Sequence, residues 1–363
     1  MQITLYSPAV QAIFEQGKKR VMGDFTLYYA PHFLQLKHVF QVAAGARTQT
    51  PVVLVAIAYQ GQIGYGEASM PPYLGESHDS VMHFIDQVDF TPFKDAFRLE
   101  DMLEYIDGIA QGNTAAKAAL DIALHDVLGK RMGQPWYKIW GLDPEDTVPT
   151  SFTIGIDSQE MIRQKVAEAT EFKVLKVKLG AGNDREIIET IRSLSDQPIC
   201  VDANQGWKDR EEAIEMIEWL HHQNVLFVEQ PMPKTAWEDH AWLKERSPLP
   251  IVADEAAQRL KDVRQVAQAY DGINIKLMKC TGLYEARKMI ALARDLDLKI
   301  MLGCMTETSC AISAASQLAP LADWLDLDGA LLIKDDLFTG MQVQDGKVKL
   351  SDAPGIGLQE TIH

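Results

Sequence analysis

Short apolar runs recur along the chain from residue 150 onward, and stretches with helical patterning separate them. Examples of the amphipathic stretches are SQEMIRQKVAEATEF (158–172) and DREEAIEMIEWLHHQ (209–223). The apolar runs are TSFTIG (150–155), LKVKLG (175–180), ICVDAN (199–204), LFVEQP (226–231), IVADEA (251–256), INIKLM (273–278), IMLGCM (300–305) and WLDLDG (324–329). Strands that alternate with helices, at about one unit per 25 residues, predict an α/β fold, a (β/α)8 TIM-type barrel.

An open, doubly wound sheet is the alternative architecture for such a pattern. That fold would carry a G-x-G-x-x-G turn after its first strand, and no such turn follows residues 150–155. The nearly equal length of the units also favours closure into a barrel.

The first part of the chain and its tail have a different pattern. QTPVVLVAIAY (49–59) runs through a Gln-Gly turn into QIGYGEAS (62–69), which predicts an antiparallel hairpin. Residues 116–128 carry apolar side chains at helical spacing, and an Asp-Gly turn at 345–346 separates two strand-like runs. We predict an α+β capping domain at 1–145, the barrel at 146–330, and a C-terminal segment at 331–363 that returns to the capping domain.

Composition places the chain among ordinary globular proteins, with 47% hydrophobic and 24% charged residues. The formal net charge of −16 argues against a nucleic-acid partner, because phosphate binding needs clustered Lys and Arg. We see neither a signal peptide nor an apolar run that could span a membrane, so we expect a cytoplasmic protein. The cysteines lack zinc-binding spacing and are interpreted as thiols of a reducing compartment.

Charged residues gather at the ends of the predicted barrel strands. Active sites of TIM barrels lie at these C-terminal ends, and residues i and i+2 of a strand share a face. A single buried carboxylate would more often form a structural ion pair, but charges on successive strand ends favour one active site. The residues at these ends are Lys176, Lys178, Asp202, Asn204, Glu229, Asp254, Glu255, Lys276, Asp326 and Asp328.

Asp202, Glu229 and Asp254 come from consecutive strands and have no His or Cys beside them. Such oxygen ligands are typical of Mg²⁺, for which Mn²⁺ could substitute, and they disfavour Zn²⁺. A lysine near the cation should have a lowered pKa and could act as a base. Lysines on opposite faces of one carbon could then remove and return a proton beside a carboxylate, through a metal-stabilised enediolate. Schiff-base formation by one lysine is the alternative, but it does not account for the carboxylates.

The sequence resembles the enolase superfamily, and within it the muconate-lactonizing subgroup. The resemblance implies that Lys178 and Lys276 are the acid/base pair and that the three carboxylates bind Mg²⁺. Lys176 would neighbour the substrate carboxylate, whereas strand alternation turns Lys279 to the other face and outside the catalytic set. The matching motifs are GYGEAS (64–69), AALDIALHDVLGKRMGQPWYKIWG (118–141), KVK (176–178), VDANQGW (201–207), VEQP (228–231), ADEA (253–256) and NIKLMKCTG (274–282).

Further positions are similar to those of the dipeptide epimerases in this subgroup. There a DxD like Asp326-Leu327-Asp328 binds the α-ammonium of the substrate, as paired carboxylates can. Thr153 and Cys304 match substrate-contacting positions. QVAAGARTQTP (41–51) would be a mobile lid, and its Arg47 is a candidate to bind the side-chain carboxylate of the second residue. A solvated lid arginine is the alternative.

The resemblance thus implies an isomerase, a Mg²⁺-dependent epimerase that inverts the α-carbon of the C-terminal residue of a dipeptide. L-Ala-D/L-Glu from cell-wall peptide is the expected substrate. The alternatives are o-succinylbenzoate synthase, muconate cycloisomerase and N-succinylamino-acid racemase, whose substrates lack a free ammonium for the DxD. A non-catalytic binding barrel would not need the metal and lysine sets. A homo-oligomer is compatible with a capped barrel, but the sequence does not fix the number of subunits.

Overall fold

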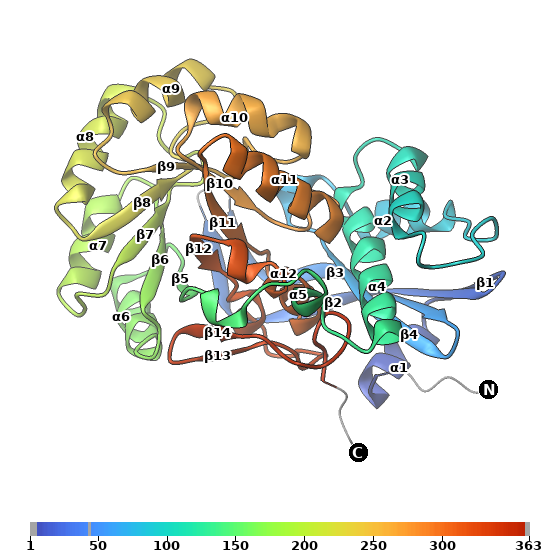
Figure 1. Cartoon of the computed structure of the whole chain (residues 1–363). Coiled ribbons are helices and arrows are strands. Elements are labelled where there is room, and N and C mark those ends of the chain that lie inside the picture. Colours follow the sequence, from blue (N-terminus) through green and yellow to red (C-terminus); the bar gives the residue numbers. More distant parts are fainter. Residues whose placement is uncertain (1–5, 43–44, 360–363) are drawn as a thin grey trace.

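Short parallel strands form the centre of the molecule, and their order in the sheet follows their order in the sequence (Figure 1). The computed structural model describes residues 6–42 and 45–359. A parallel bridge between Thr150 and Leu325 brings the last strand beside the first, so the predicted barrel is confirmed. The strands are β5 (Ser151–Ile154), β6 (Val174–Lys178), β7 (Ile199–Asp202), β8 (Val225–Glu229), β9 (Ile251–Ala253), β10 (Gly272–Ile275), β11 (Lys299–Gly303) and β12 (Trp324–Asp326).

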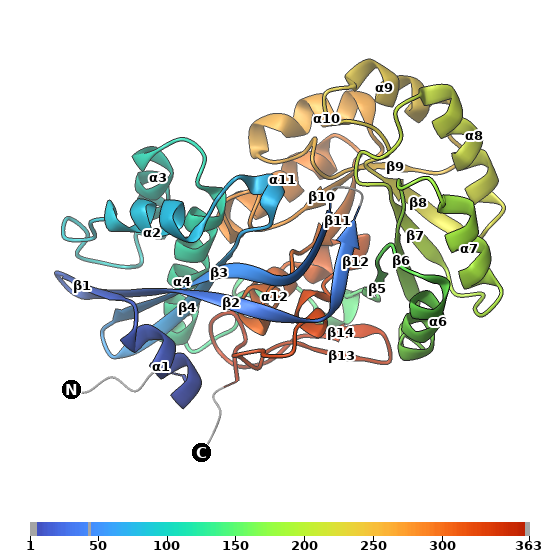
Figure 2. The same cartoon turned by 180° about the vertical axis from the view of Figure 1, so that it is seen from behind.

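Helices follow the barrel strands and cover the outside of the sheet (Figure 1, Figure 2). Their starts have a local cause, because Ser158, Asp209 and Thr308 each accept a hydrogen bond from a first-turn amide. No described helix is long and apolar enough to cross a membrane. The elements are α6 (Gln159–Glu168), α7 (Asp184–Arg192), α8 (Arg210–His221), α9 (Trp237–Arg246), η3 (Leu260–Asp262), α10 (Val263–Ala269), α11 (Leu283–Asp295), α12 (Ser309–Ser316) and η4 (Ala319–Leu321).

The capping domain is an antiparallel sheet with helices on it. The predicted hairpin is present as β3 and β4, and the predicted helix is α4. This helix lies close to β4, since a Cβ on Gly66 would come within 1.9 Å of the Ala119 carbonyl oxygen. The elements are α1 (Pro8–Glu15), β1 (Lys18–Met22), β2 (Phe25–Val42), β3 (Gly45–Tyr59), β4 (Gln62–Ser69), η1 (Pro72–Leu74), α2 (His78–Asp86), α3 (Leu99–Ile109), α4 (Thr114–Met132), α5 (Trp136–Ile139) and η2 (Pro144–Asp146).

The tail contains η5 (Gly329–Leu332), β13 (Gln342–Gln344) and β14 (Lys347–Lys349). It returns to the capping domain, where Ile333 pairs with Leu36 of β2 and Gly355 pairs with Pro135. The fold class is therefore confirmed, including the contribution of the tail to the cap. The exact domain bounds at residues 145 and 330 stay predictions.

Candidate active site

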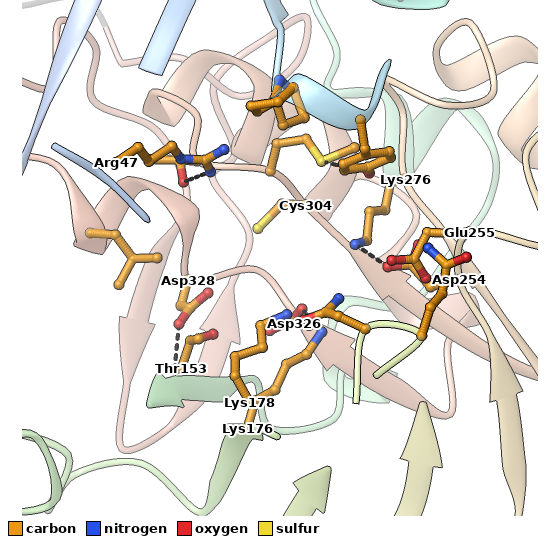
Figure 3. Close-up of a pocket in the computed structure, with 18 residues that line it drawn as sticks. Arg47, Thr153, Lys176, Lys178, Asp254, Glu255, Lys276, Cys304, Asp326 and Asp328 are labelled. Atoms are coloured by element: carbon orange, nitrogen blue, oxygen red, sulfur yellow. Dashed lines mark hydrogen bonds and ion pairs between the residues drawn. The ribbon is translucent and has the colours of Figure 1, made fainter. Parts of the chain in front are cut away.

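A cavity of about 310 Å³ lies at the C-terminal ends of the barrel strands (Figure 3). The capping domain contributes Arg47 of β3 and Tyr73 of η1 to its walls. Asp202 and Glu229 are fully buried beside it. The structure thus brings together the residues that the sequence placed in the site, and their roles stay predictions. The predicted residues that line the cavity from the barrel are Thr153, Lys176, Lys178, Asn204, Asp254, Glu255, Lys276, Cys304, Asp326 and Asp328.

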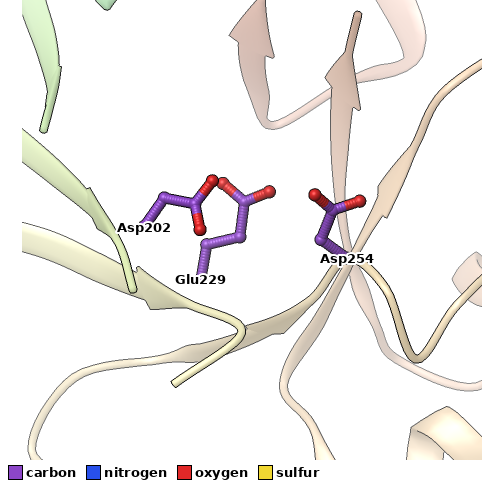
Figure 4. Close-up of side chains that lie close together, drawn as sticks. All are labelled: Asp202, Glu229 and Asp254. Carbon is purple, nitrogen blue, oxygen red and sulfur yellow. The ribbon is translucent and has the colours of Figure 1, made fainter. Parts of the chain in front are cut away.

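Asp202, Glu229 and Asp254 point toward one another from the ends of β7, β8 and β9 (Figure 4). One oxygen from each can be chosen so that all lie within 4.8 Å of one another. Burial, and then the charge of Asp202, raises the pKa of Glu229 to about 7. Lysines neighbour all three carboxylates, yet Asp202 and Glu229 still repel each other, and a divalent cation would relieve that repulsion. The residues present therefore fit Mg²⁺.

Lys178 and Lys276 enter the cavity from different walls, on β6 and just after β10 (Figure 3). The Nζ atom of Lys178 lies 2.6 Å from Oδ2 of Asp202, and that of Lys276 lies 2.6 Å from Oδ2 of Asp254. Burial is the largest single influence and acts to lower the pKa of Lys276, but the surrounding negative charges, led by Asp254, together raise that pKa well above its usual range. The lowered lysine pKa expected from the sequence depends on a neighbouring cation, and it stays a prediction.

Lys176 connects the carboxylate triad to the Asp326-Leu327-Asp328 segment. Its Nζ atom lies 2.7 Å from Oε2 of Glu229 and 2.6 Å from Oδ2 of Asp326. The other oxygen of Asp326 accepts a hydrogen bond from the Ser151 hydroxyl at 2.9 Å. Lys176 and Ser151 therefore already bind both oxygens of Asp326.

Asp328 has a different environment from Asp326. Its Oδ2 atom accepts a hydrogen bond from the backbone amide of Thr153 at 2.7 Å, and its side chain faces the cavity (Figure 3). Burial, followed by the charge of Asp326, raises the pKa of Asp328 to about 7. Cys304 also lines the cavity, and burial raises the pKa of its thiol well above the usual range. Asp328 is thus the better placed of the two aspartates to bind a substrate cation.

Arg47 reaches the cavity from β3, within the segment 41–51 that was predicted to be a lid. Its Nη2 atom donates to the hydroxyl of Thr306 at 3.0 Å, and its side chain is half-buried. Residues 43 and 44 of the predicted lid lie outside the described residues. The neighbouring Thr306 and Tyr73 line the same cavity, and sequence reasoning had not placed either of them in the site.

Lys279 lies outside the cavity, as expected, but strand alternation is not the reason. Strand β10 ends at Ile275, so strand alternation no longer applies at Lys279, four residues later. Lys279 is fully buried, and its Nζ atom donates to both the carbonyl and the carboxylate of Asp254. It does not line the cavity, so it holds Asp254 from behind.

Two buried amides also orient the triad, and both were missed from the sequence. Asn274 donates from Nδ2 to Oε1 of Glu229 at 2.6 Å. Gln230 accepts, through Oε1, hydrogen bonds from the backbone amides of Asp254 at 3.0 Å and Ala256 at 3.1 Å. Alternation along β10 could have found Asn274, because it stands two residues before Lys276.

Two family models match most of the chain. Residues 26–141 match the N-terminal domain of mandelate racemase/muconate lactonizing enzymes, and residues 158–360 match the enolase C-terminal domain-like model. The chain is 56% identical over 345 residues to the L-Ala-D/L-Glu epimerase of Bacteroides thetaiotaomicron, covering 95% of this chain and 90% of that protein. It is 40% identical over 333 residues to the L-Ala-D/L-amino acid epimerase of Pedosphaera parvula, covering 89% and 95% respectively.

Solved structures of epimerases share the fold. The substrate-liganded L-Ala-D/L-Glu epimerase from Bacillus subtilis has a TM-score of 0.87 at 29% identity, covering 93% of this chain and 99% of that one. The dipeptide epimerase from Cytophaga hutchinsonii, complexed with Mg and D-Ala-L-Val, has a TM-score of 0.84 at 27% identity, covering 94% and 96%. The expected superfamily and isomerase class are therefore confirmed. The chain belongs to the mandelate racemase/muconate lactonizing enzyme family of the enolase superfamily.

Proposed function

We propose that this protein is a Mg²⁺-dependent dipeptide epimerase that inverts the α-carbon of the C-terminal residue, with L-Ala-D/L-Glu as its best substrate. One arrangement carries the proposal. Lys178 and Lys276 face a single cavity, with the carboxylate triad beside it and Asp328 in its wall. The L-Ala-D/L-Glu epimerase of Bacteroides thetaiotaomicron supports the choice of substrate through its similarity to this chain.

The lysines would replace the α-proton from opposite faces of the carbon. One removes it from one face of the carbon, and the other returns a proton to the opposite face, which inverts the centre through an enediolate. Asp202, Glu229 and Asp254 would hold the metal. When bound, Mg²⁺ supplies positive charge against the negative charge that the substrate carboxylate gains as the neighbouring carbon loses its proton. Lys176, buried beside Glu229, would add to this charge and stand beside Lys178.

The amine end of the substrate distinguishes this proposal from its alternatives. Asp328 faces the cavity with a carboxylate, which can bind an α-ammonium. Muconate, o-succinylbenzoate precursors and N-succinylamino acids carry no such ammonium. A carboxylate buried in the cavity would repel their acidic groups, so epimerisation of a free dipeptide is the better match.

Deuterium wash-in tests the function directly. The protein should be incubated in D₂O with MgCl₂ and a panel of dipeptides, and the α-position of the C-terminal residue followed by NMR. We expect incorporation together with epimerisation, greatest for L-Ala-L-Glu and L-Ala-D-Glu and abolished by chelation. Absence of incorporation across the panel, with turnover of an N-succinylamino acid instead, would overturn the proposal.

Asn274 should tune metal affinity through Glu229. Removing a side chain that orients a metal ligand typically weakens binding about 10- to 100-fold, and we expect that loss for Mg²⁺ in Asn274→Ala. Isothermal titration calorimetry gives the affinity, and the Mg²⁺-dependent rise in thermal midpoint provides a second reading. Gln164→Ala, which removes an exposed amide on α6, is the matched control and should bind Mg²⁺ normally. Unchanged affinity in a folded Asn274→Ala protein would contradict this role.

Arg47 should select the side chain of the second residue. We expect Arg47→Met to raise KM for L-Ala-L-Glu about 10-fold, because a charge-assisted bond to the substrate carboxylate is lost. KM for L-Ala-L-Leu, which lacks that carboxylate, should change little. Arg163→Met, at an exposed position of α6, is the control. Equal changes for both dipeptides would instead favour the alternative that Arg47 has no part in specificity.

A further inference from the structure

A second cavity, of about 290 Å³, adjoins the candidate active site. Thr153 and Leu332 line both cavities, so they form the partition between them. The other walls of the second cavity come from β2, α6, the segment around η5, and β13. Figures 1 and 2 both show β13 near the foot of α6, on the side of the barrel where β5 begins.

The lining of this second cavity is largely apolar. Phe152, Phe172 and Val343 contribute to its walls. Two further lining residues, Val39 and Leu331, are hydrophobic yet 51% and 37% exposed. Apolar side chains that stay exposed around a concave site are typical of ligand-binding surfaces.

The charged residues of the second cavity balance one another. The charged side chains in its lining are two lysines, Lys37 and Lys165, and two carboxylates, Glu168 and Glu171. This balance gives an ionic ligand no net attraction, so the occupant that fits is an apolar group.

The position of the second cavity identifies which part of a substrate could reach it. The Thr153 amide donates to Asp328 at 2.7 Å, so the partition stands directly beside the carboxylate that faces the cavity. In an amino acid, the ammonium and the side chain are attached to the same carbon. A first residue whose ammonium is bound by Asp328 therefore has its side chain within reach of Thr153 and Leu332.

We propose that the second cavity is a subsite for a large apolar side chain on the first residue of the dipeptide, an inference that rests on the proposed function. The enzyme would then accept leucine or phenylalanine at the first position as well as alanine. Small movements of Leu332, which is only partly buried, would open the partition.

Filling the second cavity tests the subsite. Leu331→Trp and Val343→Trp each enlarge a residue that lines this cavity and not the first. Val21→Trp, at a 71% exposed position of β1, is the matched control. Epimerisation of L-Ala-L-Glu, L-Leu-L-Glu and L-Phe-L-Glu should be measured for each protein, with the alanine dipeptide reporting folding and chemistry.

In the wild type, kcat/KM for the leucine and phenylalanine dipeptides should be within about 10-fold of that for the alanine dipeptide. Each filling variant should lower kcat/KM for the two larger substrates about 10- to 100-fold. It should lower kcat/KM for the alanine dipeptide less than about 2-fold. Turnover of the alanine dipeptide alone by the wild type would overturn the subsite and leave the proposed function intact. Equal effects of filling on all three substrates would also overturn it. If the wild type epimerises none of them, the proposed function fails as well.

Discussion

Lys276→Ala should lower kcat for dipeptide epimerisation by about 10²- to 10⁴-fold, the range that loss of a general acid or base produces. The Lys276 ammonium lies 2.6 Å from Asp254 and faces the cavity, and no other described lysine that lines the cavity comes from that wall. Epimerisation needs proton transfer at both faces of the carbon. Losing one lysine therefore stops inversion even if the other still works.

Hydrogen exchange separates this role from a structural one. In Lys276→Ala, Lys178 should still exchange the α-hydrogen of one epimer with D₂O, while exchange of the other epimer is lost. Lys178→Ala should show the opposite preference. NMR of each pure epimer in D₂O measures both rates, and exchange of both epimers at wild-type rates in either variant would refute the two-base assignment.

Folding and metal binding should be checked in the same proteins. Lys279 still holds Asp254 when Lys276 is removed, so we expect Lys276→Ala to bind Mg²⁺ and to fold. Lys94→Ala, which removes an exposed lysine of the capping domain, is the matched control and should keep wild-type kcat.

The barrel could be predicted from the sequence because each strand and each helix carries its own local pattern. The predicted run at 175–180, for example, overlaps β6 (Val174–Lys178), and charged residues at strand ends have one place to meet in a closed barrel. Strand β2 was missed for a physical reason. Pro31 interrupts its pattern, and the register with β3 shifts between Gln35 and Phe40.

Contacts between segments far apart in the chain could not be predicted from the sequence. Tyr73 enters the cavity from η1, which follows β4, and nothing in its local sequence pattern indicates that it reaches the active site. The contact of Lys279 with Asp254 was missed because the chain leaves strand geometry after Ile275. Asp326 and Asp328 look equivalent in the sequence. In the structure they have different hydrogen-bond partners: Lys176 and Ser151 for Asp326, and the Thr153 amide for Asp328.

The difference between Asp326 and Asp328 leads to a prediction about substrate binding by Asp328. Asp328→Asn should lower kcat/KM for L-Ala-L-Glu about 100-fold, mainly through a higher KM. Truncating one partner of a buried charge pair commonly costs about 2–5 kcal/mol of binding free energy, and a loss of about 100-fold lies within that range. The amide oxygen of asparagine can still accept the hydrogen bond from Thr153, so the backbone should keep its position. Steady-state kinetics of epimerisation measures the effect.

A substrate without the ammonium shows whether charge is the cause. N-acetyl-L-Ala-L-Glu should be a poor substrate of the wild type. Asp328→Asn should not lower kcat/KM for it further, because this substrate has no ammonium to bind the carboxylate. Asp24→Asn, at an exposed position, should leave both substrates unchanged. If Asp328→Asn lowered kcat equally for the free and the acetylated dipeptide, Asp328 would act on the chemistry or the fold. Asp326, which Lys176 and Ser151 already bind, would then be the stronger candidate for the amine site.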